Sequence, residues 1–226
     1  MLEIIHIHIP KTAGTSLLNV LQKKYSPNEI CTIKRKELTG NSFEKNSEII
    51  KNNISMNHKI LHGHFFYKEI EPIVNLHKNV KIITFLRNPV DRVISNYLFF
   101  KQRINEGKVD KNELSRKNET LMEYARLEES QNRQSKFLEG INLEKLYFSG
   151  IMETFAEDIK YLSQKLDINI NGIPVLNKNK HSESSAFNIS ENELQELKSL
   201  NQKDLLLYQI ALEIRRKSNS TELNKN

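Results

Sequence analysis

A run of small and polar residues near the N-terminus has the composition of a phosphate-binding loop. The run reads Pro10-Lys11-Thr12-Ala13-Gly14-Thr15-Ser16. It lies between a β-branched segment and a segment with helical spacing, where backbone N–H groups and the positive end of a helix can hold a phosphate. Lys11 adds a positive charge, and Thr15 and Ser16 add hydroxyl donors. The alternative is an ordinary strand-to-helix turn, because glycine and threonine are common where helices begin.

This loop differs from the Walker A sequence of nucleotide kinases. In a Walker A sequence the lysine directly follows the second glycine, whereas here Lys11 precedes Gly14 by three residues. A kinase loop must also help to hold Mg²⁺, while a phosphosulfate carries less charge and can be bound by lysine and backbone donors alone. The displaced lysine therefore disfavours a P-loop nucleotide kinase, which stays as an alternative.

A second segment offers an arginine and a hydroxyl for another phosphate. It runs from Arg87 through Asn88 and Pro89 to Ser95, directly after the strongest strand pattern of the chain. Helical spacing places Asn88, Arg92 and Ser95 on one face, so a guanidinium and a hydroxyl could hold one phosphate together. In the alternative interpretation, Arg87 is a capping or ion-pairing arginine and Ser95 has no role.

The sequence His62-Gly63-His64 offers a general base. Histidine suits proton removal from a hydroxyl near neutral pH because of its ordinary pKa. We expect the two side chains to point to opposite sides of an extended segment, so that at most one faces the site. Both could instead be structural. We expect no metal site, because no cysteine pair or H-E-x-x-H sequence accompanies His6, His8 and these two residues.

Strands alternating with helices must position these groups. We expect strands at 3–9, 59–61, 80–86 and 146–149, and helices at 15–25, 88–104, 153–166 and 190–217. A further helical pattern covers 121–139, whereas 105–120 and 171–189 read as connections. The alternation predicts an α/β fold with a mostly parallel sheet flanked by helices, and ligands beyond the carboxyl ends of its strands. Residues 1–217 would form a single domain and 218–226 a disordered tail.

Composition narrows the class of protein only slightly. The chain has 226 residues, of which 38% are hydrophobic, and a net charge of +6. Such charge suggests an anionic partner, but lysines alternate with glutamates over 34–51, which is typical of a solvated surface rather than a nucleic-acid footprint. The single cysteine, Cys31, excludes an internal disulfide. With no long apolar run and no signal-peptide pattern, we expect a cytoplasmic protein without a membrane span.

Together the two phosphate-binding segments resemble the PAPS-dependent sulfotransferases, and in particular the carbohydrate branch with the heparan sulfate 2-O- and 6-O-sulfotransferases. In that family, a P-K-T-[AG]-G-[ST]-[ST] loop binds the 5′-phosphosulfate and an R-[ND]-P-x-x-R-x-x-S segment binds the 3′-phosphate. The resemblance thus implies that the 5′ end contacts Lys11, Thr12, Ala13, Gly14, Thr15 and Ser16. It likewise assigns Arg87 and Ser95 to the 3′-phosphate, and it implies a P-loop-like sulfotransferase fold.

Four further segments are similar to parts of the family. They are Leu61-His62-Gly63-His64-Phe65, Asn132-Arg133-Gln134-Ser135, Phe148-Ser149-Gly150-Ile151-Met152-Glu153, and the basic stretch with Lys180 and His181. By this resemblance His64 is the general base, and His62 orients that base or touches the substrate. Arg133 and Gln134 become candidates for the acceptor side. Lys180 and His181 would close over the 3′-phosphate.

The resemblance implies in-line transfer of a sulfuryl group from PAPS to a hydroxyl, with Lys11 beside the reacting group, 3′,5′-ADP as product and no metal. The expected acceptor is a carbohydrate or a similar hydroxylated molecule. Heparan-type enzymes usually carry a membrane anchor, and this sequence shows none, so a bacterial cell-surface or capsular glycan precursor, or another small hydroxylated metabolite, fits better than heparan. Two alternatives remain: the kinase, which would consume ATP with Mg²⁺, and a non-catalytic binder of phosphorylated nucleotides or nucleic acid. Nucleic-acid affinity that falls steeply with salt, without PAPS affinity, would mark the binder.

Overall fold

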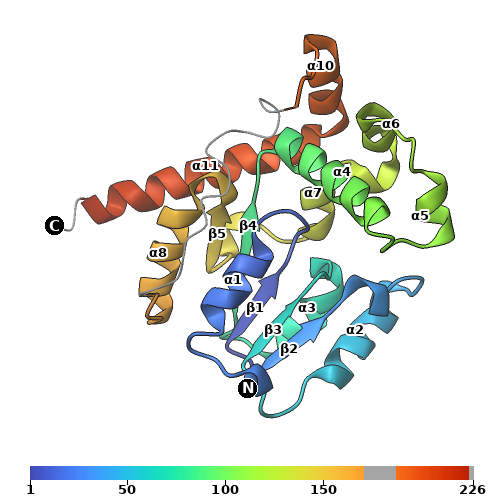
Figure 1. The fold of residues 1–226 in the computed structure, drawn as a ribbon. Coiled ribbons are helices and arrows are strands. Elements are labelled where there is room, and N and C mark those ends of the chain that lie inside the picture. The colour runs from blue at the N-terminus through green and yellow to red at the C-terminus, as the bar shows by residue number, and fades with distance from the viewer. Residues whose placement is uncertain (171–186, 224–226) are drawn as a thin grey trace.

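Five parallel strands form one sheet in the order β2-β3-β1-β4-β5 in the computed structural model, which describes residues 1–170 and 187–223 (Figure 1). The strands are β1 Ile4–Ile7, β2 Ile30–Ile33, β3 Ile60–Gly63, β4 Lys81–Leu86 and β5 Phe148–Ile151. This sheet confirms the predicted α/β architecture. The central strand β1 has β3 on one side and β4 on the other, so the chain connections on its two sides lead in opposite directions. Such a change of direction opens a crevice at the carboxyl ends of these strands.

Helices cover both faces of the sheet. One face packs against α1 Gly14–Leu21 and α8 Phe155–Leu166, and the other against α2 Phe43–Asn53, α3 Tyr67–Leu76, α7 Arg133–Phe137 and α11 Gln202–Leu223. Along β1, Ile4 lies in the first of these cores, whereas Ile5 and Ile7 lie in the second. Burial on both faces explains why the strands read as continuous apolar runs.

A separate group of helices lies beyond the carboxyl end of β4 (Figure 1). It contains α4 Pro89–Asn105, α5 Lys111–Ser115, α6 Leu121–Arg126 and α10 Glu191–Leu200, and α4, α6 and α10 share an apolar core. Short 3₁₀ turns complete the described elements at Pro27–Glu29, Arg35–Glu37, Glu128–Ser130, Leu143–Lys145 and Met152–Thr154. Of these helices, α4 lines the crevice.

Four expected strands correspond to β1, β3, β4 and β5, but β2, α2 and α3 were not predicted. The segment that precedes and forms α2 was interpreted as a solvated surface, because lysines alternate with glutamates there. Helix α5 lies in the expected connection at 105–120, and α11 continues to Leu223, past residue 217 where we expected the tail to begin. No helix in the described part of the chain is long and apolar enough to cross a membrane.

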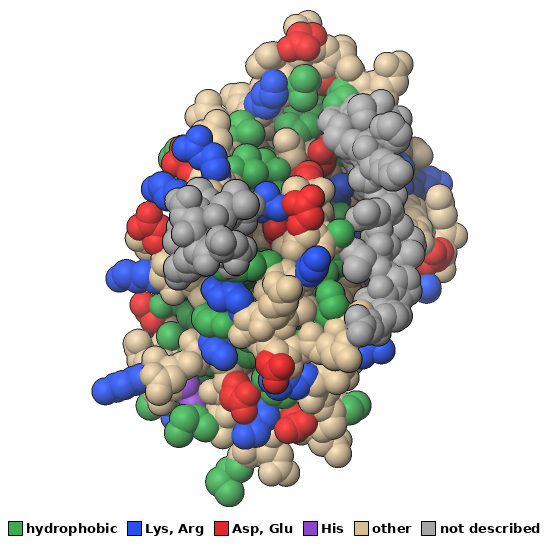
Figure 2. All heavy atoms as spheres, turned by 90° about the vertical axis from the view of Figure 1, so that its left-hand side faces the viewer, with side chains coloured by type: hydrophobic (Ala, Val, Ile, Leu, Met, Phe, Trp, Pro, Cys, Tyr) green, Lys and Arg blue, Asp and Glu red, His purple; other side chains and the backbone are tan. Residues whose placement is uncertain are grey.

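Charges are dispersed over the face of the molecule shown in Figure 2. Lysine and arginine side chains alternate there with aspartate and glutamate. A concentration of positive charge is found instead inside the crevice.

Candidate functional site

A cavity of about 660 Å³ opens where the carboxyl ends of β1, β3 and β4 meet α4 and α7. Its lining consists of His8, Pro10, Lys11, Ala13, Gly14, Thr15, Arg35, His64, Arg87, Ser95, Asn96, Phe99, Arg133, Phe137 and Met152. Four of these residues are lysine or arginine, and none is aspartate or glutamate. A concave surface with one sign of charge concentrates anions, so the lining suits a phosphorylated or sulfated ligand.

The loop after β1 is shaped by its own backbone and by a histidine. Lys11 and Ala13 have positive φ angles of 70° and 64°, a strained conformation for residues with a side chain. Thr12 is buried, and its hydroxyl donates to the carbonyl of Ile9 at 2.9 Å. A Cβ on Gly14 would lie 1.8 Å from the His8 ring, so glycine is required there by packing. These contacts hold the loop around the cavity.

The turn after β4 joins this loop. The Arg87 side chain is almost fully buried, and its Nη1 donates to the carbonyl of Lys11 at 3.3 Å. Asn88 caps α4, its side chain accepting from the backbone N–H groups of Val90 and Asp91. Because α4 begins here, Ser95 follows on the face of the helix that lines the cavity. Arg87, Ser95 and the β1 loop thus share one cavity.

Four imidazoles lie together on the face of the sheet covered by α1. The expectation that His62 and His64 point to opposite sides is wrong, because residues two apart in a strand share a face. His62 lies deeper, with its Nδ1 2.8 Å from Nδ1 of His6. The His8 ring stacks on the His64 ring with centroids 4.1 Å apart. Of these four, only the outer pair, His8 and His64, lines the cavity.

Burial keeps these histidines neutral at pH 7. It lowers the pKa of His62 to about 4 and that of His8 to about 2, with nearby imidazoles adding to the effect, and it holds the pKa of His6 well below its usual range. Burial, with Arg133 and Arg35 nearby, also lowers the pKa of His64, although a hydrogen bond to His8 opposes this. Neutral imidazole is the form that can accept a proton.

The tautomer of His64 follows from one hydrogen bond. Its Nδ1 lies 2.7 Å from the backbone carbonyl of His8. A carbonyl oxygen only accepts, so Nδ1 carries the proton and the lone pair is on Nε2. Nε2 of His64 is therefore able to accept a proton. In the described residues, no group of three or more histidines, cysteines or acids is arranged to hold a metal ion.

Two arginines near His64 enter the cavity from other elements. Arg35 lies two residues after the end of β2. Its Nη1 donates to Oε1 and Oε2 of Glu69 at 2.8 and 2.7 Å, and its guanidinium lies over the Phe66 ring. Arg133 donates to the carbonyl of Glu129 at 3.1 Å. We did not predict Arg35, because it lies in the stretch interpreted as a solvated surface. The short β-branched run just before it was the available signal.

Several predicted site residues lie away from the cavity. Gln134 is fully buried and bonds to the backbone of Arg87, whereas Thr12, Ser16 and His62 are not among the lining residues. Lys180 and His181 fall outside the described residues. Besides Arg35, the cavity lining contains six residues that we did not predict as site residues: His8, Pro10, Asn96, Phe99, Phe137 and Met152. Phe99 has the Lys11 ammonium 4.4 Å from its ring centroid.

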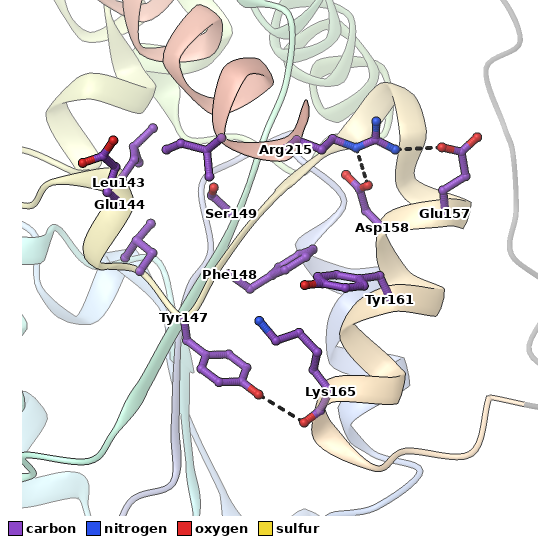
Figure 3. A pocket seen from close by; sticks show the side chains of 12 residues that line it. Leu143, Glu144, Tyr147, Phe148, Ser149, Glu157, Asp158, Tyr161, Lys165 and Arg215 are labelled. Atoms are coloured by element: carbon purple, nitrogen blue, oxygen red, sulfur yellow. Dashed lines mark hydrogen bonds and ion pairs between the residues drawn. The ribbon is translucent and has the colours of Figure 1, made fainter. Parts of the chain in front are cut away.

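A second hollow of about 310 Å³ lies between β5, α8 and α11 (Figure 3). Here the Lys165 ammonium lies 4.6 and 5.2 Å from the ring centroids of Tyr147 and Tyr161. Arg215 of α11 donates to Asp158 at 2.6 Å and to Glu157 at 2.7 Å, both on α8. Cations and acids are thus mixed in this lining, and Arg215 ties two helices together.

The fold and the cavity define a parallel α/β protein with an anion site between strand ends. The model of the sulfotransferase family matches residues 2–210, and the chain belongs to that family. No curated protein matches the sequence.

Two solved structures are similar to this chain. The mouse sulfotransferase SULT7A1 complexed with PAP shares 20% identity over 75% of this chain, with a TM-score of 0.49. The matched region spans 60% of the mouse protein's length. A sulfotransferase from Alicyclobacillus acidocaldarius shares 14% identity, with a TM-score of 0.49, over 90% of this chain and 93% of that one.

Proposed function

We propose that this protein transfers a sulfuryl group from PAPS to a hydroxyl group, with His64 as general base. The observation that carries the proposal is the cavity, which combines four cations and no carboxylate with a neutral imidazole whose proton is on Nδ1. The β1 loop supplies one set of hydrogen-bond donors, and the turn at Arg87 supplies a second set. Two separate sets of donors fit a ligand with two separate anionic groups.

Each set has a role in this proposal. When bound, PAPS supplies an activated sulfuryl group together with a stable leaving group. Lys11 and the N–H groups of its loop stabilise the negative charge that develops at the 5′ end, while Arg87 and Ser95 bind the 3′-phosphate. Nε2 of His64 accepts the proton of the attacking hydroxyl, and the His8 carbonyl keeps the ring oriented during this transfer.

We propose a carbohydrate as the acceptor, of the kind found in bacterial cell-surface or capsular precursors in the cytoplasm. Arg35 and Arg133 support an acceptor with an acidic group near its reactive hydroxyl, because both line the cavity and both lie close enough to His64 to lower its pKa. Such a group would bind these guanidinium ions through charge-assisted hydrogen bonds.

Titration calorimetry with 3′,5′-ADP in metal-free buffer tests the proposal. We expect a dissociation constant of about 1 μM to 100 μM for the wild type, weakened about tenfold or more in Lys11→Ala and in Arg87→Ala. Lys23→Ala removes the same charge from an exposed position outside the cavity and should bind normally. Absence of binding by the wild type would refute the proposal.

Turnover assays separate the remaining alternatives. Sulfated product from PAPS without metal supports the proposed reaction, and consumption of ATP with Mg²⁺ would favour a kinase instead. Nucleic-acid binding that weakens steeply with salt, in the absence of any affinity for 3′,5′-ADP, would favour a non-catalytic binder.

A further inference from the structure

The peptide groups of Arg87 are held by one buried side chain. Oε1 of Gln134 accepts from the Arg87 N–H, and Nε2 of Gln134 donates to the Arg87 carbonyl, each at 2.9 Å. Gln134 is 0% exposed, so water cannot replace either bond if the amide is removed. Its primary amide therefore makes the two hydrogen bonds to the Arg87 backbone that a neighbouring strand would make, at the point where β4 has ended.

Gln134 is itself fixed because α7 and α11 cap each other. The buried carboxylate of Asp204, in the first turn of α11, accepts from the backbone N–H groups of Gln134 at 3.0 Å and Ser135 at 2.7 Å. In return, Oδ1 of Asn132 accepts from the N–H groups of Lys203 at 2.9 Å and Asp204 at 3.3 Å. Each helix therefore satisfies donors that the other leaves open at its N-terminus.

A second connection ties the next residue to the same helix. The Asn88 N–H donates to Oε1 of Glu153 at 2.8 Å, and the Tyr208 hydroxyl of α11 donates to Oε2 of Glu153 at 3.0 Å. In Figure 1, α11 passes beside α7 and β5. Both peptide N–H groups of the turn, those of Arg87 and Asn88, are consequently fixed by contacts that lead to α11.

We propose that Gln134 and Asp204 are positioning residues that direct the Arg87 guanidinium into the cavity. The direction of a side chain follows from its backbone, and the Arg87 backbone beyond the strand is bound by Gln134. The Lys11 loop has contacts of its own, the Thr12 hydroxyl bond to Ile9 and the packing of Gly14 on His8, besides the bond from the Arg87 guanidinium to the Lys11 carbonyl. Loss of the clamp should therefore weaken binding of the anion that Arg87 contacts more than binding at Lys11. The identity of these anions rests on the proposed function.

Selectivity between two nucleotides tests this proposal. In Gln134→Leu, we expect the dissociation constant for 3′,5′-ADP to rise about tenfold or more, while that for 5′-AMP, which lacks the 3′-phosphate, changes by less than about threefold. Asp204→Asn should shift the ratio of these two dissociation constants in the same direction, but by a smaller factor. Gln164→Leu, an exposed glutamine of α8, serves as the matched control. Adding Arg87→Ala to Gln134→Leu should cause no further loss of 3′,5′-ADP binding.

The proposal would be overturned if folded Gln134→Leu bound both nucleotides more weakly by the same factor, or if its ratio of the dissociation constants for 3′,5′-ADP and 5′-AMP equalled that of the wild type. Hydrogen exchange in the ligand-free wild type gives a test that needs neither nucleotide nor variant. The Arg87 amide should exchange as slowly as the amides within β4, and exchange at the rate of an exposed loop would also overturn it. A wild type without affinity for either nucleotide would refute the proposed function, while the exchange rate would still test the clamp.

Discussion

Two hollows beside the same sheet are lined by lysine and arginine side chains, but they differ in whether acidic residues share the lining. The larger cavity is lined by lysine and arginine side chains and by no acidic residue, although Arg35 is paired with Glu69 outside the lining. The smaller one, between β5, α8 and α11, places Arg215 against Asp158 and Glu157 (Figure 3). Like charges gathered in a concave site repel one another, whereas charges paired across two helices hold those helices together.

This difference separates a site that receives a ligand from a structural contact. Substitutions in the larger cavity should change binding or turnover, and a substitution in the smaller hollow should change only stability. The stacked histidines provide the same contrast within one cluster, because the outer pair faces the cavity and the inner pair is buried beneath it.

The largest expected effect comes from the outer histidines. His64→Ala should lower kcat by about 10²- to 10⁴-fold, because His64 is the proposed base and its bond to the His8 carbonyl leaves Nε2 able to accept the hydroxyl proton. Calorimetry should show 3′,5′-ADP binding within about threefold of the wild type, since the phosphate donors are untouched. His58→Ala, outside the cavity, is the control. Normal turnover in His64→Ala would remove this residue as the base.

The inner histidines should make the protein sensitive to acid. The folded state depresses the pKa of His62 from 6.5 to about 4, so the unfolded chain binds protons first as the pH falls. Stability is therefore complete above about pH 6.5 and is lost toward pH 4, by roughly 3 kcal/mol from this residue alone. Urea unfolding across this range measures the loss. In the double variant His6→Val/His62→Val the pH dependence should shrink, and an unchanged curve would contradict this account.

Packing between Gly14 and His8 gives a smaller effect. Gly14→Ala would place its Cβ 1.8 Å from an atom of the His8 ring, far inside the van der Waals distance, so the ring must move, at a cost of about 1 to 3 kcal/mol. Thermal unfolding should show a lower midpoint, and adding His8→Ala should restore part of the loss. Failure of His8→Ala to restore any stability would show that the ring is not what excludes a side chain there.

The smallest effect is expected in the second hollow. Arg215→Ala removes the tie between α11 and α8 and should lower the free energy of unfolding by about 1 to 2 kcal/mol. Its kcat and its affinity for 3′,5′-ADP should match those of the wild type. A selective loss of turnover would mean that the two hollows are not as different as their linings indicate.

The sequence allowed the central strands and both anion-binding segments to be found, because their signals are local. A β-branched run before Pro10, and the apolar run that ends before Arg87, each mark a buried strand whose carboxyl end carries polar residues. Our error on His62 and His64 concerned the side-chain period of a strand. Correctly applied, that period alone places both histidines on one face.

The remaining features depend on contacts between distant segments. Arg35 reaches the cavity only because β2 joins the sheet edge, and nothing near Arg35 in sequence indicates this pairing. Gln134 looked like an acceptor-side residue, yet its amide bonds to the Arg87 backbone. Which polar side chains face a cavity and which satisfy buried backbone groups is decided by tertiary packing, so spacing in the sequence could not distinguish them.

The mutual capping of α7 and α11 also bears on the order in which the protein is made. Asp204 leaves the ribosome long after Arg87 and the β1 loop, so the early part of the chain can build its sheet before the clamp on Arg87 is complete. A nascent chain should therefore acquire its strands first and its full affinity for 3′,5′-ADP only when α11 has emerged. Synthesis itself would then delay this binding until α11 is in place.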